Sequence, residues 1–282
     1  MNDEIEHFAH MAKQGSKKDL ENLIEQIQSR IYNLSLRILG YASDAEDATQ
    51  EILIKIITHL SNFKGNSRFT TWSYRIAVNH LLNLKKNKFR ELNFAFDYWE
   101  ELGYRTDPTF DYNSVEEPTK TLLAEEVRIG CMQGMLQCLE RKIRIAFILG
   151  ELFELSGNEA AEILGITKTA YRKRLSRGRD KIYQFMQENC SLVNSNNHCH
   201  CTKLVGPDIR DKFIDPENLQ FVGERCHAEI NTTVMDRLNE LDEIKRSMVL
   251  FRSYPEYSSP DSVVSMVKEM IDSKQYKILH HY

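Results

Sequence analysis

The sequence predicts an all-α protein in which two helical units are joined by an acidic linker and followed by a mostly helical C-terminal extension. Apolar residues recur at three- and four-residue steps over long stretches, as from Asp19 to Leu39, and this period is typical of amphipathic helices. No convincing alternation of apolar and polar residues indicates a strand. The helical period fails over one stretch that is rich in Asp, Glu, Tyr, Phe and Pro, and this stretch is the expected linker.

These patterns divide the 282 residues into four ranges, in keeping with domains of roughly 100–150 residues. The ranges are a first helical unit (1–90), an acidic linker expected to be flexible (91–119), a second helical unit (120–189) and a Cys/His-containing extension (190–282). A helical hairpin is expected in the extension. Its first arm runs from about Glu224 to Arg252, and Ser259-Pro260 begins the second, with proline at the first helical position.

The first unit has clear helix boundaries. Gly40 is expected to end the helix that begins near Asp19, because glycine readily adopts the left-handed conformation of a helix C-cap. Ser43 and Glu46 match a capping box, which predicts a second helix to about Leu60. A turn over residues 63–68 then precedes a third helix from about Thr70 to Lys86.

Composition limits the function classes. The formal net charge is −4, so nucleic-acid binding would depend on local clusters of Lys and Arg. No stretch approaches the ~18 apolar residues needed to span a bilayer, and the acidic N-terminus lacks a secretory signal pattern, so a cytoplasmic protein without membrane insertion is expected. In that compartment the six cysteines are expected to be free thiols or metal ligands rather than disulfides.

Residues Glu159 to Lys181 resemble a helix-turn-helix motif, with a second capping box at Ser156 and Glu159. From Thr167 to Lys181 there are seven basic residues and one acidic residue, Asp180. This segment is therefore strongly positive, although the net charge of the whole chain is negative. Such a helix suits the major groove of DNA, although a solvated cationic helix face is the alternative reading.

Two further segments make the resemblance specific. Residues 44–51 read DAEDATQE and residues 63–79 read FKGNSRFTTWSYRIAVN, while residues 174–179 read RLSRGR. In this order they resemble the second and fourth conserved regions of extracytoplasmic-function (ECF, group IV) RNA polymerase sigma factors of the sigma-70 family. One departure is Ala170-Tyr171-Arg172-Lys173, where many members read Thr-Val-Lys-Ser, so the upstream promoter preference cannot be transferred.

The resemblance implies an alternative sigma factor, not an enzyme, that binds core RNA polymerase and directs promoter-specific transcription initiation. It implies contact with the polymerase β′ coiled coil through Asp44, Asp47, Gln50 and Glu51. It implies recognition of the −10 promoter element through Phe63, Lys64, Gly65, Asn66, Ser67, Arg68, Trp72 and Asn79. It implies recognition of the −35 element through Lys168, Tyr171, Arg172, Arg174, Arg177 and Arg179.

Simpler readings exist for several of these residues. Asp44 would also stabilise the first turn of its helix through the helix dipole. Phe63, Phe69 and Trp72 could be core aromatics, and for Phe69 this is the better reading. In the fourth-region match, Tyr171 and Arg172 are the expected base readers, because the N-terminal part of a recognition helix reaches base edges.

The extension carries Cys190, Cys199 and Cys201, which are candidate ligands for a structural zinc ion. His198, His200, Cys226 and His227 could complete a tetrahedral site. The segment resembles a cysteine-bearing extension of one sigma-factor subgroup. A thiol redox switch and simple packing stay open as alternatives, and no cofactor is otherwise required.

Promoter DNA, the β flap and β′ coiled coil of core polymerase, and an anti-sigma factor are therefore the expected partners. The competing reading is a helix-turn-helix regulator that binds an operator without joining polymerase, which leaves residues 63–79 without a role. A hydrolase or nucleotide-dependent enzyme lacks support, because the sequence contains no phosphate-binding G-x-x-x-x-G-K-[ST], H-E-x-x-H or G-x-S-x-G motif.

Overall fold

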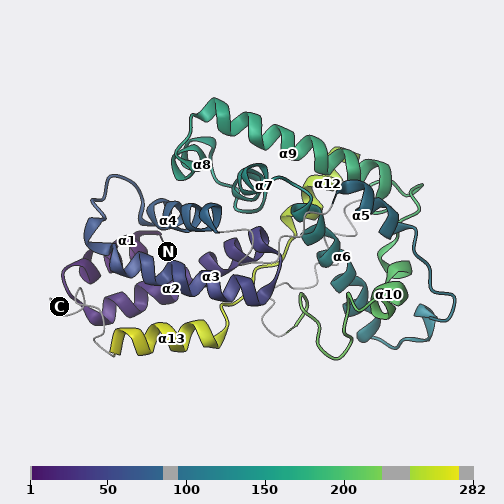
Figure 1. Ribbon diagram of the computed structural model, residues 1–282, viewed down its shortest axis with the longest axis horizontal. Helices are drawn as coiled ribbons and strands as arrows, with labels where there is room; N and C mark the ends of the chain where they lie inside the picture. The colour runs from purple at the N-terminus through teal and green to yellow at the C-terminus, as the bar shows by residue number, and fades with distance from the viewer. Residues whose placement is uncertain (1, 85–94, 224–241, 273–282) are drawn as a thin grey trace. The chain divides into compact units, whose positions relative to one another are not determined.

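The computed structural model describes residues 2–84, 95–223 and 242–272 and confirms the all-α prediction (Figure 1). Its α-helices are α1 (Asn2–Lys13), α2 (Lys17–Leu39), α3 (Ala42–Thr58), α4 (Phe69–Asn83), α5 (Phe96–Gly103), α6 (Thr119–Gln137), α7 (Arg141–Phe147), α8 (Gly157–Leu164), α9 (Lys168–Asn189), α10 (Cys201–Arg210), α12 (Glu243–Arg252) and α13 (Asp261–Asp272). Short turns are η1 (Leu60–Asn62), η2 (Tyr112–Ser114) and the π-helical η3 (Ile148–Leu152).

The chain forms two compact units that alternate along the sequence. Unit 1 contains residues 1–91, 155–172 and 257–282, and unit 2 contains residues 92–154 and 173–256. None of the helices in the described residues is long and apolar enough to cross a membrane.

The framework of unit 1 is the packing of α1, α3 and α4 around α2. The predicted stripe of α2 is buried, with Leu23, Ile27 and Ile31 at most 1% exposed. Gly40 ends α2 in the left-handed conformation, at φ 93°, as predicted. The capping box predicted at Ser43 is wrong: α3 begins at Ala42 with Tyr41 as its N-cap, so the serine lies inside the first turn.

A second layer of unit 1 comes from a distant part of the sequence. Helix α13 packs against α2 and α3, and its residues Val263, Val267 and Ile271 are buried. Asn33 of α2 holds the segment that leads into α13. Its side-chain nitrogen donates a hydrogen bond to the carbonyl of Tyr257 at 2.7 Å, and its side-chain oxygen accepts one from the Tyr257 N–H at 3.0 Å. These residues therefore join the extension to the first helical unit.

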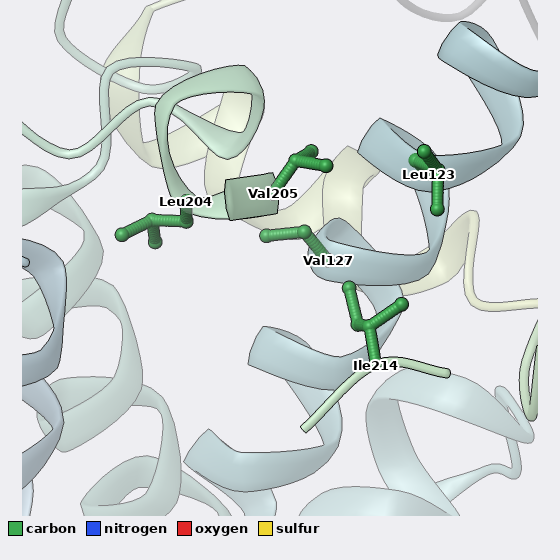
Figure 2. Close-up of a cluster of buried hydrophobic side chains, with 5 residues drawn as sticks. All are labelled: Leu123, Val127, Leu204, Val205 and Ile214. Carbon is green, nitrogen blue, oxygen red and sulfur yellow. The ribbon is translucent and has the colours of Figure 1, made fainter. Parts of the chain in front are cut away.

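In unit 2, α6 packs against α10 across a small apolar core (Figure 2). Leu123 and Val127 come from α6, Leu204 and Val205 from α10, and Ile214 from the segment after α10. The range predicted as a linker also contains α5, which packs on α6 and which the sequence did not predict. Of the predicted hairpin, the described residues contain α12 and α13, while residues 224–241 lie outside them.

Candidate nucleic-acid interface

The loop between η1 and α4 is held at both ends by α1. The Lys13 ammonium donates to the carbonyl of Phe63 at 2.6 Å, and the backbone N–H of Phe69 donates to Oε1 of Glu6, also at 2.6 Å. The second contact satisfies a free donor in the first turn of α4, which has no cap from its own side chains. The loop thus has fixed ends and an exposed centre.

Three aromatic rings support this loop. Phe63, Phe69 and Trp72 form a cluster with centroids 5.3 to 5.4 Å apart. Phe69 is fully buried, which confirms its reading as a core aromatic, and Phe63 is 8% exposed. Trp72 is half-buried. Of the three rings, Trp72 is therefore the most accessible to a ligand.

The centre of the loop presents small and polar groups to solvent. Lys64, Gly65 and Asn66 are exposed, and Ser67 is half-buried. Gly65 has φ +70°, and no atom lies within 4 Å of the position that a Cβ would take. The backbone conformation, and not lack of space, therefore favours glycine at this position.

An open groove of about 550 Å³ lies between α3 and α4. Its lining residues are Lys55, His59, Asn62, Trp72, Ile76, Asn79, His80, Asn83 and Leu84. Two of the predicted −10 residues, Trp72 and Asn79, are thus brought to one surface. Lys55, His59 and His80 were not predicted, because they come from segments outside the matched motif or from its edge.

The wall of this groove carries a polar chain of side chains. Lys55 Nζ lies 2.5 Å from Nδ1 of the buried His80, and His80 Nε2 lies 3.6 Å from Oε2 of Glu51. Because an ammonium group only donates, Nδ1 of His80 must accept this hydrogen bond. The groove thus combines an aromatic wall, amide groups and cationic groups, which suit stacking, base recognition and phosphate contact respectively.

The predicted polymerase-binding residues lie on α3 with different exposures. Asp47 is exposed, whereas Asp44, Gln50 and Glu51 are half-buried. Glu51 faces His80 across the α3–α4 contact. Asp47 is therefore the most accessible carboxylate of the set.

Helix α8 packs against α4 within unit 1. Arg75 Nη2 donates to the carbonyl and to Oε1 of Glu162, at 3.0 and 3.1 Å. Arg68, a predicted −10 residue, lies 3.6 Å from Oε1 of Glu159. Both ion pairs are exposed, so each contributes little stability by itself.

The helix-turn-helix reading is supported by its local geometry. The capping box at Ser156 and Glu159 is present, and Gly165 ends α8 in the left-handed conformation at φ 62°. Tyr171 is only 2% exposed, and its ring lies 3.7 Å from the position of a Gly157 Cβ. The structure therefore assigns Tyr171 to packing at the start of α9, which corrects its expected place on the DNA-facing surface.

The remaining predicted −35 residues separate into two groups. Lys168, Arg172 and Arg177 are exposed, and Arg174 is half-buried. Arg179 instead contacts the fully buried Glu151 in η3, with Nε donating to Oε1 at 2.7 Å and Nη2 donating to the same oxygen. Tyr183 donates to Oε2 of Glu151 at 2.9 Å.

Comparisons with known proteins agree with both regions. The Sigma-70 region 2 family matches residues 23–91, and the Sigma-70, region 4 family matches residues 129–182. The RNA polymerase sigma-H factor of Pseudomonas aeruginosa is 28% identical over 182 residues, covering 64% of this chain and 93% of that protein. A solved structure, "Structure of CnrH in complex with the cytosolic domain of CnrY", covers 65% of this chain and 97% of that chain, with 17% identity and a TM-score of 0.47.

The ECF RNA polymerase sigma-E factor of Escherichia coli K12 is 30% identical over 171 residues, which are 60% of this chain and 87% of that protein. SigW of Bacillus subtilis, also an ECF sigma factor, is 28% identical over 180 residues and is covered to 93% of its length. From these matches, and from the two regions in their expected order, the chain belongs to the ECF RNA polymerase sigma factors, which direct transcription initiation.

Proposed function

We propose that this sigma factor opens promoters by holding an unstacked base of the −10 element at residues 64–67 while the adjoining strand occupies the groove between α3 and α4. The observation that carries the proposal is the groove itself, because Trp72 and Asn79 line it together with the cationic Lys55. Extruding a base costs a few kcal/mol, so stacking and polar contacts at the destination are needed to offset that cost.

Binding of core polymerase is proposed to occur through the exposed side of α3. Asp47 is accessible there, and its carboxylate suits the arginines of a partner helix such as the β′ coiled coil. The β flap and an anti-sigma factor stay predictions that rest on the family resemblance. The protein would act in the cytoplasm, beside polymerase, and would need no catalytic group of its own.

Recognition of the −35 element is proposed for α9. Arg172 is exposed near the start of the helix, where side chains reach base edges, and Arg177 is exposed further along, where phosphate contact is expected. Replacing Arg172 with alanine should then change the preferred upstream sequence. Replacing Arg177 should weaken all sequences alike and reduce the salt dependence.

Permanganate footprinting of a melted promoter tests the central proposal. The double variant Asn66→Ala with Ser67→Ala should bind core polymerase and duplex promoter normally but melt the promoter less, because the loop acts only on an unstacked base. The matched control is Asn218→Ala, which removes an exposed amide from unit 2. Normal melting by the double variant would show that the loop is only a connector.

A further inference from the structure

The extension begins with a pair of cysteines that the backbone sets opposite each other. An isolated parallel bridge joins Cys190 to Cys199, and the N–H of Ser191 donates to the carbonyl of Cys199 at 3.1 Å. Cys201 follows two residues later as the first residue of α10. The three predicted zinc ligands of the extension therefore come from one short, ordered stretch of chain.

A fourth thiol comes from α6 and was not predicted. Cys199 and Cys201 pack against the apolar core that includes Leu123 and Val127 on α6. Cys131 lies four residues after Val127, so it continues the same helix face by one turn. Helix α5 connects Cys131 to the thiols of the extension, because Trp99 contacts Cys131 and Gly103, one turn later on the same helix, lies against Cys199.

The end of α5 completes the surroundings of these thiols. Trp99 Nε1 donates to Sγ of Cys131 at 3.4 Å. Gly103 packs against both Cys199 and His198. A Cβ atom at this position would lie 3.4 Å from Sγ of Cys199 and 3.5 Å from Nε2 of His198, so the absence of a side chain leaves space beside both atoms. The His198 ring is held against Tyr104, with centroids 3.5 Å apart. Within the part of the chain that the structure describes, Nε2 of His198 is buried and has no hydrogen-bond partner.

We propose that Cys131, Cys190, Cys199 and Cys201 bind one Zn²⁺ ion through their sulfur atoms, with the imidazole of His198 beside the site. Among the described residues, no three Cys, His, Asp or Glu side chains stand in the arrangement of a formed metal site. The thiols would therefore have to rotate about their Cα–Cβ bonds and lose their protons as the ion enters. Four thiolates around Zn²⁺ form an ordinary structural site, and the unsatisfied His198 nitrogen is a polar group suited to that site or its edge. The site would tie the extension to α6, the first long helix of unit 2.

The experiment measures zinc on the full-length chain purified without an affinity tag. Elemental analysis should give one zinc per chain, and competition with a chromogenic chelator should give the affinity. Cys131→Ser should weaken zinc binding by at least roughly tenfold. Loss of a residue that only hydrogen-bonds to a metal ligand already lowers metal affinity by about that factor, and loss of a ligand itself should cost more. The matched control is Cys138→Ser, since Cys138 stands at the C-cap of the same helix and burial alone dominates its raised pKa of about 12.

A second measurement separates loss of the site from loss of the fold. Circular dichroism should be the same for the two serine variants, and Co²⁺ bound to the native chain should show thiolate charge-transfer bands that weaken in Cys131→Ser alone. Substoichiometric zinc with four freely reactive thiols in the folded chain would overturn the proposal. So would equal zinc affinity of Cys131→Ser and native protein, or a Cys190–Cys199 disulfide detected by mass spectrometry, which would indicate a redox pair.

Discussion

Arg179→Ala should destabilise unit 2, even though Arg179 belongs to the basic recognition helix. The Arg179 side chain is 41% exposed, but its partner Glu151 is fully buried in η3. Among the described residues, removing the arginine leaves a buried carboxylate that keeps the hydrogen bond from the Tyr183 hydroxyl but loses its cationic partner. Loss of one partner of a buried ion pair costs about 3 to 5 kcal/mol, because the remaining charge is not compensated.

For Arg179→Ala the loss of unfolding free energy should lie in the lower half of that range, because Arg179 is partly exposed and water can approach the carboxylate of Glu151. A loss of about 3 kcal/mol corresponds to a fall of roughly 6 to 12 °C in the melting temperature of a unit of this size. Arg177→Ala is the matched control, because Arg177 is exposed on the same helix and surface changes usually stay within about 0.5 kcal/mol.

Urea and thermal unfolding of the two alanine variants provide the assay. A double variant, Glu151→Gln with Arg179→Met, should recover part of the lost stability, because it removes the buried charge together with its partner. If Arg179→Ala unfolds like the native chain but binds promoter DNA more weakly at every salt concentration, the contact with Glu151 is not structural. Arg179 would then act in −35 recognition, as the family resemblance implies.

Three further substitutions test other contacts. Asn33→Ala should loosen residues 257–272 from α2 and α3, because it removes the two hydrogen bonds that Asn33 makes to the backbone of Tyr257. Hydrogen exchange of the amides in residues 257–272 should then accelerate, and unchanged protection would contradict the reasoning. Glu126→Ala should lower the free energy of unfolding by about 3 kcal/mol, because it removes the acceptor of three hydrogen bonds from the backbone N–H groups of residues 220–222. An unchanged midpoint of urea unfolding would refute this prediction. Arg172→Ala should change the upstream sequence recovered from randomised promoters without altering the unfolding free energy.

Local signals predicted helix boundaries well where one side chain decided them. The capping box at Ser156 forms because the residue precedes the first helical turn, whereas Ser43 fails because the helix already begins at Ala42. Only two residues, Gly40 and Tyr41, separate that helix from the preceding one. The sequence pattern could not distinguish an N-cap serine from one in the first turn.

The candidate sites were predictable only where their residues were adjacent in sequence. The loop at residues 63–68 was identified from its motif, but the groove depends on Lys55 and His59, which reach it through the packing of α3 on α4. Arg179 was read as a DNA contact because its partner, Glu151, lies 28 residues away. Cys131 was missed for the same reason, since no spacing rule connects a helix residue to thiols some sixty positions later.

Because Asn33 binds Tyr257, the first helical unit cannot finish folding until the C-terminal part of the chain has been synthesised. The two residues are separated by 224 positions. At roughly 5–20 residues per second, a ribosome needs on the order of 10 to 45 s to make the chain between them. During that interval the first helical unit has left the ribosome while α13 does not yet exist, so the faces of α2 and α3 that α13 later covers are open to solvent, chaperones or polymerase. The duration of this open state is set by the rate of translation and not by the affinity of α13 for its site.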